Sequence, residues 1–158
     1  MIEMETAIKH SIFIDGEHLT LEQILLVARN KATVKLHVSG KEKLLRSRKI
    51  VERIISSGEV AYGITTGFGK FSDVSISKED CNTLQKNIIM SHACGVGEPL
   101  PQEVVRAMML LRANSLAKGY SGVRLELVEL LLNMLNSGIH PVVPCKGSVG
   151  ASGDLIPL

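Results

Sequence analysis

The first forty residues alternate between hydrophobic and polar positions in a way that predicts two short strands around one helix. The alternation covers residues 11–14 and returns over residues 34–38, where it ends at Ser39-Gly40. Between them, Thr20 and Gln23 have the spacing of a capping box, which predicts a helix that runs to about residue 30. This region is therefore expected to be α+β.

Beyond residue 40 the hydrophobic positions recur at helical spacing, so the chain is expected to be mainly α-helical overall. Gly58 and Gly119 supply stop signals, and Pro101 suits the first turn of a helix. The last predicted helix, over about 123–136, is hydrophobic on more than one face, which predicts packing on several sides. Four helices are expected, over residues 41–57, about 77–92, 101–118 and about 123–136.

The composition is that of an ordinary globular domain, with 158 residues, 45% hydrophobic residues and a formal charge of +2. The basic residues are scattered and aromatic residues are only 3% of the chain, so neither a basic block nor stacking side chains indicate nucleic acid. No signal peptide opens the chain and no hydrophobic run is long enough for a membrane span. A soluble, cytoplasmic protein is expected.

The cysteines and histidines lack the spacing of a metal site or a disulfide framework. Cys81, Cys94 and Cys145 are odd in number and far apart, which is typical of reduced cytosolic thiols. The five histidines include no pair four residues apart and no CxxC companion, so no metal is expected.

Ala151-Ser152-Gly153 is the stretch with the sharpest chemical interpretation. The Gly153 nitrogen is unhindered and can attack the Ala151 carbonyl if the backbone bends tightly. Loss of water from Ser152 then leaves an electrophilic methylidene group on a five-membered ring. The alternative is a mobile glycine-rich loop whose Asp154 caps a following helix.

Two other interpretations of the glycine-rich segments fit less well. Ser152 is not in a hydrolase nucleophile elbow, because Asp154 stands where the second glycine belongs. The segment from Gly63 to Lys70 is not a phosphate loop, because its glycines are one residue too far apart and Phe71 replaces the Ser or Thr.

Three segments resemble, in order, the motifs of the aromatic amino acid ammonia-lyase family. GSVGASGDLIPL (147–158) resembles the family signature, YGITTGFG (62–69) its tyrosine loop, and SHACGVGEPL (91–100) its histidine motif. LRANSLAKGYSGVR (111–124) is also similar to family sequence, so the resemblance covers nearly the whole chain.

The resemblance implies a carbon–nitrogen lyase whose electrophile, 4-methylidene-imidazol-5-one, forms from Ala151-Ser152-Gly153 without an external cofactor. It assigns Tyr62 as the base that removes a β-proton, although a free phenol ionises only near pH 10. Nearby backbone amides are expected to stabilise the phenolate. It also implies that the Gly69 backbone contacts substrate and that His92 hydrogen-bonds the substrate ring. For an isolated histidine, a charge at a helix end is the alternative role, and Tyr62 has the alternative of a structural aromatic.

The setting of His92 is similar to histidine and tyrosine lyases, and Gly95 to Leu100 favours histidine lyases. The expected reaction is therefore elimination of ammonia from L-histidine to give urocanate in histidine degradation. A tyrosine lyase or aminomutase is the enzyme alternative. Two residues depart from the family pattern: Thr65 stands where Asn is usual, and Ile156 where Ala is more common.

The resemblance also implies that this chain is an amino-terminal fragment. Residues 1–100 are expected to form an α+β region with the tyrosine loop and histidine motif, and residues 101–158 to begin a long helical bundle. Family members are homotetramers with shared active sites, so the chain alone is expected to be inactive. The alternative from another class is a non-catalytic assembly module.

Overall fold

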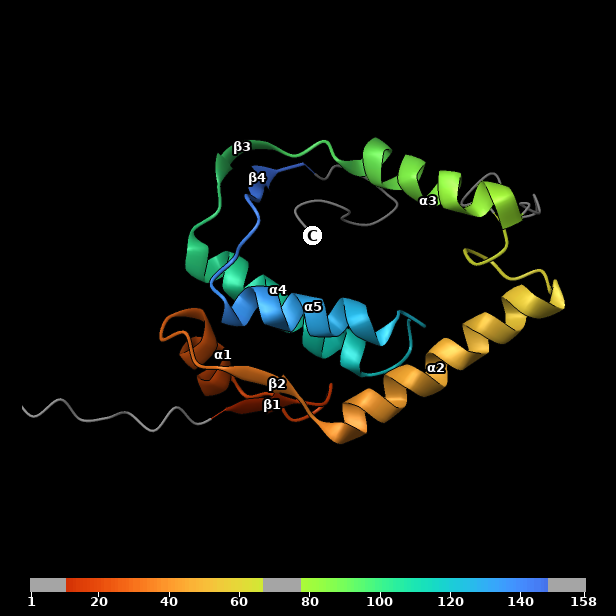
Figure 1. Cartoon of the computed structure of the whole chain (residues 1–158). Coiled ribbons are helices and arrows are strands. Elements are labelled where there is room, and N and C mark those ends of the chain that lie inside the picture. Colours follow the sequence, from red (N-terminus) through yellow and green to blue (C-terminus); the bar gives the residue numbers. More distant parts are fainter. Residues whose placement is uncertain (1–10, 67–77, 148–158) are drawn as a thin grey trace, which may run out of the picture. The chain divides into compact units, whose positions relative to one another are not determined.

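The computed structural model describes residues 11–66 and 78–147, and this part of the chain is mostly helical with two small sheets. Its elements are β1 (Ile12–Ile14), α1 (Leu21–Ala28), β2 (Val34–Leu36), α2 (Val38–Ser57), α3 (Lys78–His92), β3 (Val96–Pro99), α4 (Gln102–Ala117), α5 (Leu125–Asn136) and β4 (Pro144–Lys146) (Figure 1). The chain divides into two compact units. Met1–Leu45 and Pro101–Pro141 form the first, and Arg46–Leu100 and Val142–Leu158 form the second.

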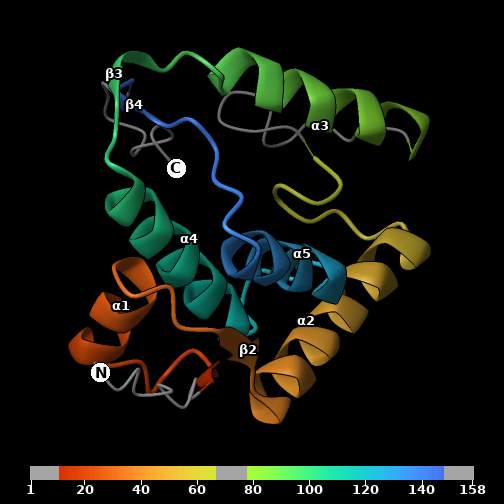
Figure 2. The same ribbon diagram turned by 60° about the vertical axis from the view of Figure 1, so that its left-hand side comes forward.

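The first unit is built from a parallel pair of strands and three packed helices. β1 and β2 pair in parallel, with Ile12 opposite Val34 and Ile14 opposite Leu36. α4 packs against both α1 and α5, and α5 also contacts β2 (Figure 2). The buried hydrophobic side chains of this unit are Ile12, Ile14, Val27, Ala28, Val34, Leu44, Val105, Met109, Leu110, Ala113, Ala117, Val128, Leu132 and Leu135.

Arg106 of α4 is the largest polar side chain in this core, with only 2% of its surface exposed. Its Nε and Nη2 groups donate to the carbonyl of Val27 at 3.0 and 2.8 Å, and Nη1 donates to the carbonyl of Leu135 at 2.9 Å. Nη1 also lies 2.9 Å from Nε2 of His140. Because Val27 and Leu135 lie in the last turns of α1 and α5, the guanidinium ties the carboxyl ends of two helices to α4.

Asn136, the last residue of α5, connects this helix to the sheet. The Val34 N–H donates to its Oδ1 at 2.9 Å, and its Nδ2 donates to the Val34 carbonyl at 2.8 Å. The side-chain amide therefore satisfies both polar groups of one strand residue, which fixes the register of α5 against β2.

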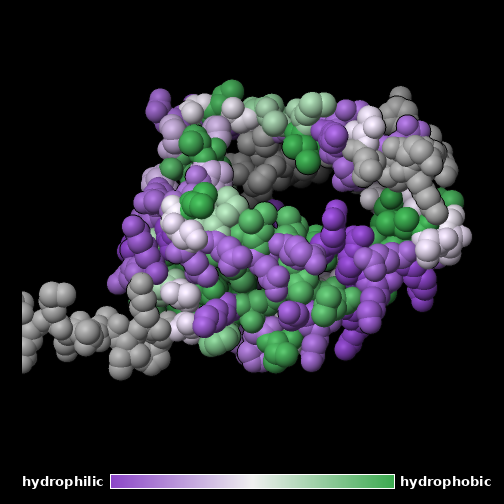
Figure 3. Space-filling view, viewed as in Figure 1, coloured by the Kyte–Doolittle hydropathy of each residue, from purple (hydrophilic) through white to green (hydrophobic). Residues whose placement is uncertain are grey.

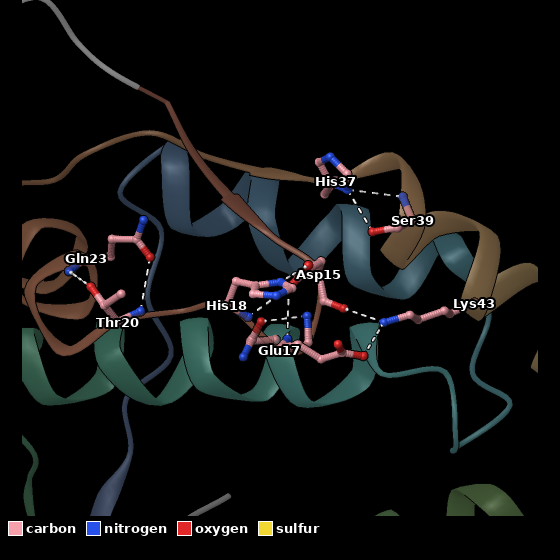
Figure 4. A network of polar contacts seen from close by, with 10 residues as sticks. Asp15, Glu17, His18, Thr20, Gln23, His37, Ser39 and Lys43 are labelled. Atoms are coloured by element: carbon pink, nitrogen blue, oxygen red, sulfur yellow. Dashed lines mark hydrogen bonds and ion pairs between the residues drawn. The ribbon is translucent and has the colours of Figure 1, made fainter.

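The turn after β1 holds a network of polar contacts centred on Asp15 (Figure 4). Its Oδ1 accepts from the N–H groups of Glu17 and His18 at 2.9 and 3.0 Å, and its Oδ2 lies 2.6 Å from His18 Nδ1. Lys43 Nζ donates to Glu17 Oε1 at 2.5 Å. The backbone N–H of Glu17 and then His18 hold the pKa of Asp15 well below its ordinary value, whereas Asp15 raises the pKa of His18.

We expect Asp15→Asn to lower the thermal unfolding midpoint most between pH 4 and pH 6. The depressed Asp15 pKa gives stability that is present above its ordinary value of 3.8 and is lost as pH falls further. The raised His18 pKa gives stability that is present below its ordinary value of 6.5 and is lost as pH rises through the folded-state pKa. Melting curves of wild type, Asp15→Asn and His18→Gln from pH 3 to 9 check this, and a pH-independent difference would contradict it.

The second unit contains most of α2, together with α3, β3 and β4. β3 and β4 pair antiparallel, with Val96 opposite Lys146 and Pro99 opposite Pro144, and the register shifts between these two pairs. The Leu100 N–H continues the pairing by donating to the Val143 carbonyl at 2.8 Å. This places the residues that follow α3 directly beside the residues that precede the predicted tripeptide.

Some hydrophobic side chains of the described residues remain at the surface (Figure 3). On α5, Val128, Leu132 and Leu135 are buried, whereas Leu127 and Leu130 are half-exposed. The helix thus keeps hydrophobic residues on two faces, as its sequence predicts, while only one face is covered by described residues. Within those residues, the structure contains no helix that is both long and hydrophobic enough to span a membrane.

The predicted helix boundaries agree with the structure to within about two residues, except that the boundary between β2 and α2 is wrong; β3 and β4 are not predicted by the sequence pattern. Thr20 and Gln23 form both hydrogen bonds of the predicted capping box, and Gly58 follows α2 with a φ of +71°. Ser39-Gly40 does not end a strand, because both residues lie in the first turn of α2. The reason is that His37 acts as the cap: its Nδ1 accepts from the Ser39 N–H at 3.2 Å, and its carbonyl accepts from the Lys41 N–H.

Candidate active site

Tyr62 lies in a tight turn that follows the end of α2. The N–H groups of Ile64 and Thr65 both donate to the Ala61 carbonyl, at 3.1 and 3.0 Å. The tyrosine side chain is 63% exposed in this structure. Among the described residues of the second unit, the turn therefore presents Tyr62 at the surface.

Two threonine hydroxyls stabilise this turn by hydrogen bonds to its backbone. Thr65 Oγ1 accepts from the Ala61 N–H at 2.8 Å and lies 2.8 Å from the Glu59 carbonyl, to which it donates. Thr66, which is buried, accepts from the Gly63 N–H at 3.3 Å through its Oγ1. The sequence pattern marks Thr65 only as a departure from the family, whereas the structure shows that its hydroxyl fixes the backbone beside Tyr62.

His92 is the final residue of α3, and its ring is half-buried. Ser91 Oγ lies 2.9 Å from His92 Nδ1, which engages one nitrogen of the imidazole. The Cys94 N–H donates to the His92 carbonyl at 2.9 Å, so the chain turns immediately after the helix. A protonated His92 at this helix end would also interact favourably with the helix dipole, and the structure is compatible with either role.

The histidine motif lies beside the residues that lead into the signature segment. The Cys94 thiol donates to the Gly147 carbonyl at 3.7 Å, and Gly97 lies opposite Cys145. Gly97 has a φ of +90°, and a Cβ atom there would stand 3.0 Å from Cys145 Sγ. Only glycine therefore permits this close approach without strain. The strand pair thus connects the motif that contains His92 with Pro144–Lys146, the residues directly before the signature.

The remaining predicted site residues lie outside the described residues. These are Gly69 of the tyrosine loop and the tripeptide Ala151-Ser152-Gly153. Tyr62 and His92 are both described and belong to the same compact unit. Their assigned roles stay predictions.

A groove in the first unit is a weaker candidate for the active site. It has a volume of about 390 Å³ and is lined by Val34, Lys35, Leu36, Lys41, Glu129, Leu132, Asn133 and Asn136. None of the predicted site residues is among them. Among the described residues, no three His, Cys, Asp or Glu side chains gather as metal ligands would.

Comparison with known sequences identifies the family. A family model described as aromatic amino acid lyase matches residues 19–158. A histidine ammonia-lyase of Caldanaerobacter subterraneus subsp. tengcongensis is 63% identical over 93% of this chain, and histidine ammonia-lyase 2 of Fusobacterium nucleatum is 58% identical over 93%. The chain spans 29% of the length of each of these curated relatives.

The solved structures with the same fold belong to enzymes whose names indicate different substrates. A tyrosine aminomutase from Streptomyces globisporus has a TM-score of 0.83 and 38% identity, and covers 88% of this chain and 26% of its own. A histidine ammonia-lyase from Trypanosoma cruzi has a TM-score of 0.82 and 34% identity, and covers 88% and 27%. Since the family model matches most of the residues, the chain belongs to the aromatic amino acid lyase family.

Proposed function

We propose that the protein that contains this chain eliminates ammonia from L-histidine to give urocanate. The observation that carries the substrate is the 63% identity to a curated histidine ammonia-lyase over 93% of the chain. The solved structures do not separate the substrates, because a tyrosine aminomutase and a histidine ammonia-lyase fit this chain about equally well.

The tripeptide has the chemistry that the family's electrophile requires. The unhindered Gly153 nitrogen attacks the Ala151 carbonyl, whose oxygen leaves as the first water when the ring closes. The Ser152 hydroxyl then leaves with a Cα proton as the second water. When formed, the methylidene-imidazolone supplies a strong electrophile for the substrate amine, which becomes a better leaving group.

Within this proposal the other residues bind substrate and move one proton. Tyr62 takes the β-proton while the Cα–N bond breaks and ammonia departs. His92 holds the substrate ring by a hydrogen bond, and the Ser91 contact to Nδ1 supports this by fixing the plane of the imidazole. The Gly69 backbone contacts the substrate.

The intact protein is proposed to be a homotetramer in which residues 101–158 begin a long helical bundle. The half-exposed Leu127 and Leu130 of α5 support this, because a further helix packed on that face would bury them. Residues 1–100 are proposed to form the region that carries the tyrosine loop and the histidine motif.

The test uses the product of the full open reading frame that encodes this chain. We expect an intact mass that lacks two waters, and equal amounts of urocanate and ammonia released from L-histidine. Ser152→Ala is the matched control, which should retain at least one of these waters and release no urocanate. Release of coumarate or a β-amino acid from L-tyrosine instead would favour the lyase or aminomutase alternative.

The chain of 158 residues, expressed alone, is expected to be inactive toward L-histidine. Activity of this short chain would contradict the proposed need for downstream residues. An open reading frame that ends at Leu158, with no lyase sequence after it, would instead favour the non-catalytic assembly module.

A further inference from the structure

Two threonine side chains support the turn around Tyr62. The peptide N–H groups on both sides of this residue, those of Ala61 and Gly63, each donate to a threonine hydroxyl. Ala61 bonds Thr65 at 2.8 Å and Gly63 bonds Thr66 at 3.3 Å. The backbone that carries the tyrosine is thus fixed from two directions.

The Thr65 hydroxyl makes two contacts with the backbone that precedes Tyr62. A hydroxyl has one proton to donate and two lone pairs, so it can serve one N–H and one carbonyl together. Thr65 Oγ1 does this, with the Ala61 N–H and the Glu59 carbonyl both at 2.8 Å. The hydroxyl thereby joins Glu59 and Ala61, which both precede Tyr62, to a residue that follows it.

These two hydrogen bonds of Thr65, here called the clasp, fix the backbone that carries the phenol. The hydroxyl of a tyrosine is at the far end of a rigid ring, so a small tilt of the backbone displaces it by more than the Cα atom moves. Displacements of about 1 Å are enough to cost roughly a hundredfold in rate when a catalytic group is misplaced. A loop that lacks the clasp would sample such tilts.

We propose that Thr65 is a positioning residue that holds Tyr62 for proton removal through its hydroxyl. The inference rests on the proposed function, because it assumes that Tyr62 is the base. It goes beyond the family pattern, in which Asn is usual at this position. An Asn side chain also offers one acceptor and donors, so it could maintain the same two contacts.

The test is a set of substitutions in the full-length protein, measured with L-histidine. Thr65→Val keeps the shape but removes the hydroxyl, and it is expected to lower kcat by about ten- to a hundredfold with KM changed less than about threefold. Thr65→Ser keeps the hydroxyl, and Thr65→Asn restores the donor and acceptor, so both should stay within about fivefold of wild type. Thr83→Val, an exposed position of α3, is the matched control and should be unchanged.

A second background separates positioning from general loss of structure. In Tyr62→Phe protein, Thr65→Val should lower the remaining rate by less than about twofold, because its effect passes through the phenol. The Thr65→Val protein should also melt within a few degrees of wild type and show the same loss of two waters. An equal further loss in the Tyr62→Phe background, or a missing dehydration, would overturn the inference.

The two proposals fail in different ways. A wild-type protein that releases ammonia from none of L-histidine, L-tyrosine and L-phenylalanine overturns the proposed function and the role of Thr65 with it. An active wild type in which Thr65→Val and Thr65→Ser behave alike overturns only the role of Thr65.

Discussion

Exchange of Tyr62 for phenylalanine in the full-length protein is expected to lower kcat with L-histidine by about 10²–10⁴-fold, the usual contribution of a positioned general base. The β-proton of the substrate is weakly acidic, so elimination is slow unless a group takes it as the Cα–N bond breaks. The substitution removes a single oxygen and retains the ring, so KM should change little. Initial rates of urocanate formation provide the measurement.

Tyr120 offers a matched control, since it is the other tyrosine of the chain and is 90% exposed. Tyr120→Phe should leave both kinetic constants unchanged. The intact mass of the Tyr62→Phe protein should still lack two waters, which shows that the electrophile forms without the phenol. Retention of more than about a tenth of the wild-type kcat by Tyr62→Phe would exclude this residue as the base.

Replacement of Arg106 by methionine is expected to cost about 3–5 kcal/mol of unfolding free energy. Methionine fills much of the same space but removes the donors to the Val27 and Leu135 carbonyls. Each hydrogen bond to a charged group is worth about 1.5–3 kcal/mol, and a buried acceptor left without a donor adds its desolvation cost. Denaturant unfolding and soluble yield of the full-length protein check this. Arg112→Met, at an exposed position of the same helix, should change stability by less than about 0.5 kcal/mol.

Arg106 also affects the pH dependence of stability through His140. Burial, then the charges of Arg106 and Lys31, lower the pKa of His140, so the folded protein protonates this ring at a lower pH than the unfolded chain does. The unfolded chain takes up a proton as pH falls below the ordinary value of 6.5, and stability is lost there. In Arg106→Met this acid-side loss should be smaller. A stability difference from wild type below about 1 kcal/mol would contradict the structural role of Arg106.

The local signals in the sequence predict most of the elements because their causes are local. The capping box of Thr20 and Gln23 forms within one turn. Gly58 follows α2 and ends the helix because its φ is positive. The end of β2 is missed because histidine rarely caps a helix, so the pattern contains no usual signal at His37. The half-exposed leucines of α5 follow from the same periodicity that predicts the helix.

Long-range polar contacts are not predictable in this way. Arg106 has a charged side chain in an amphipathic pattern, which normally indicates a solvated position, and its partners lie 79 and 29 residues away in the sequence. In the site, motif resemblance assigns Tyr62 and His92, but it does not reveal which groups hold them. The contacts of Thr65 and Ser91 are local in sequence and still need coordinates, because a hydroxyl in a loop has many possible partners.

The amide of Asn136 has a consequence for how this protein avoids its own aggregation. The Ile12 N–H donates to the Thr33 carbonyl, so in a parallel pair the polar groups of Val34 point away from β1, toward the open edge of the sheet. Such an edge is a template for strands of other molecules. Asn136 occupies both Val34 groups, so a foreign strand must first displace the end of α5 before it can pair there.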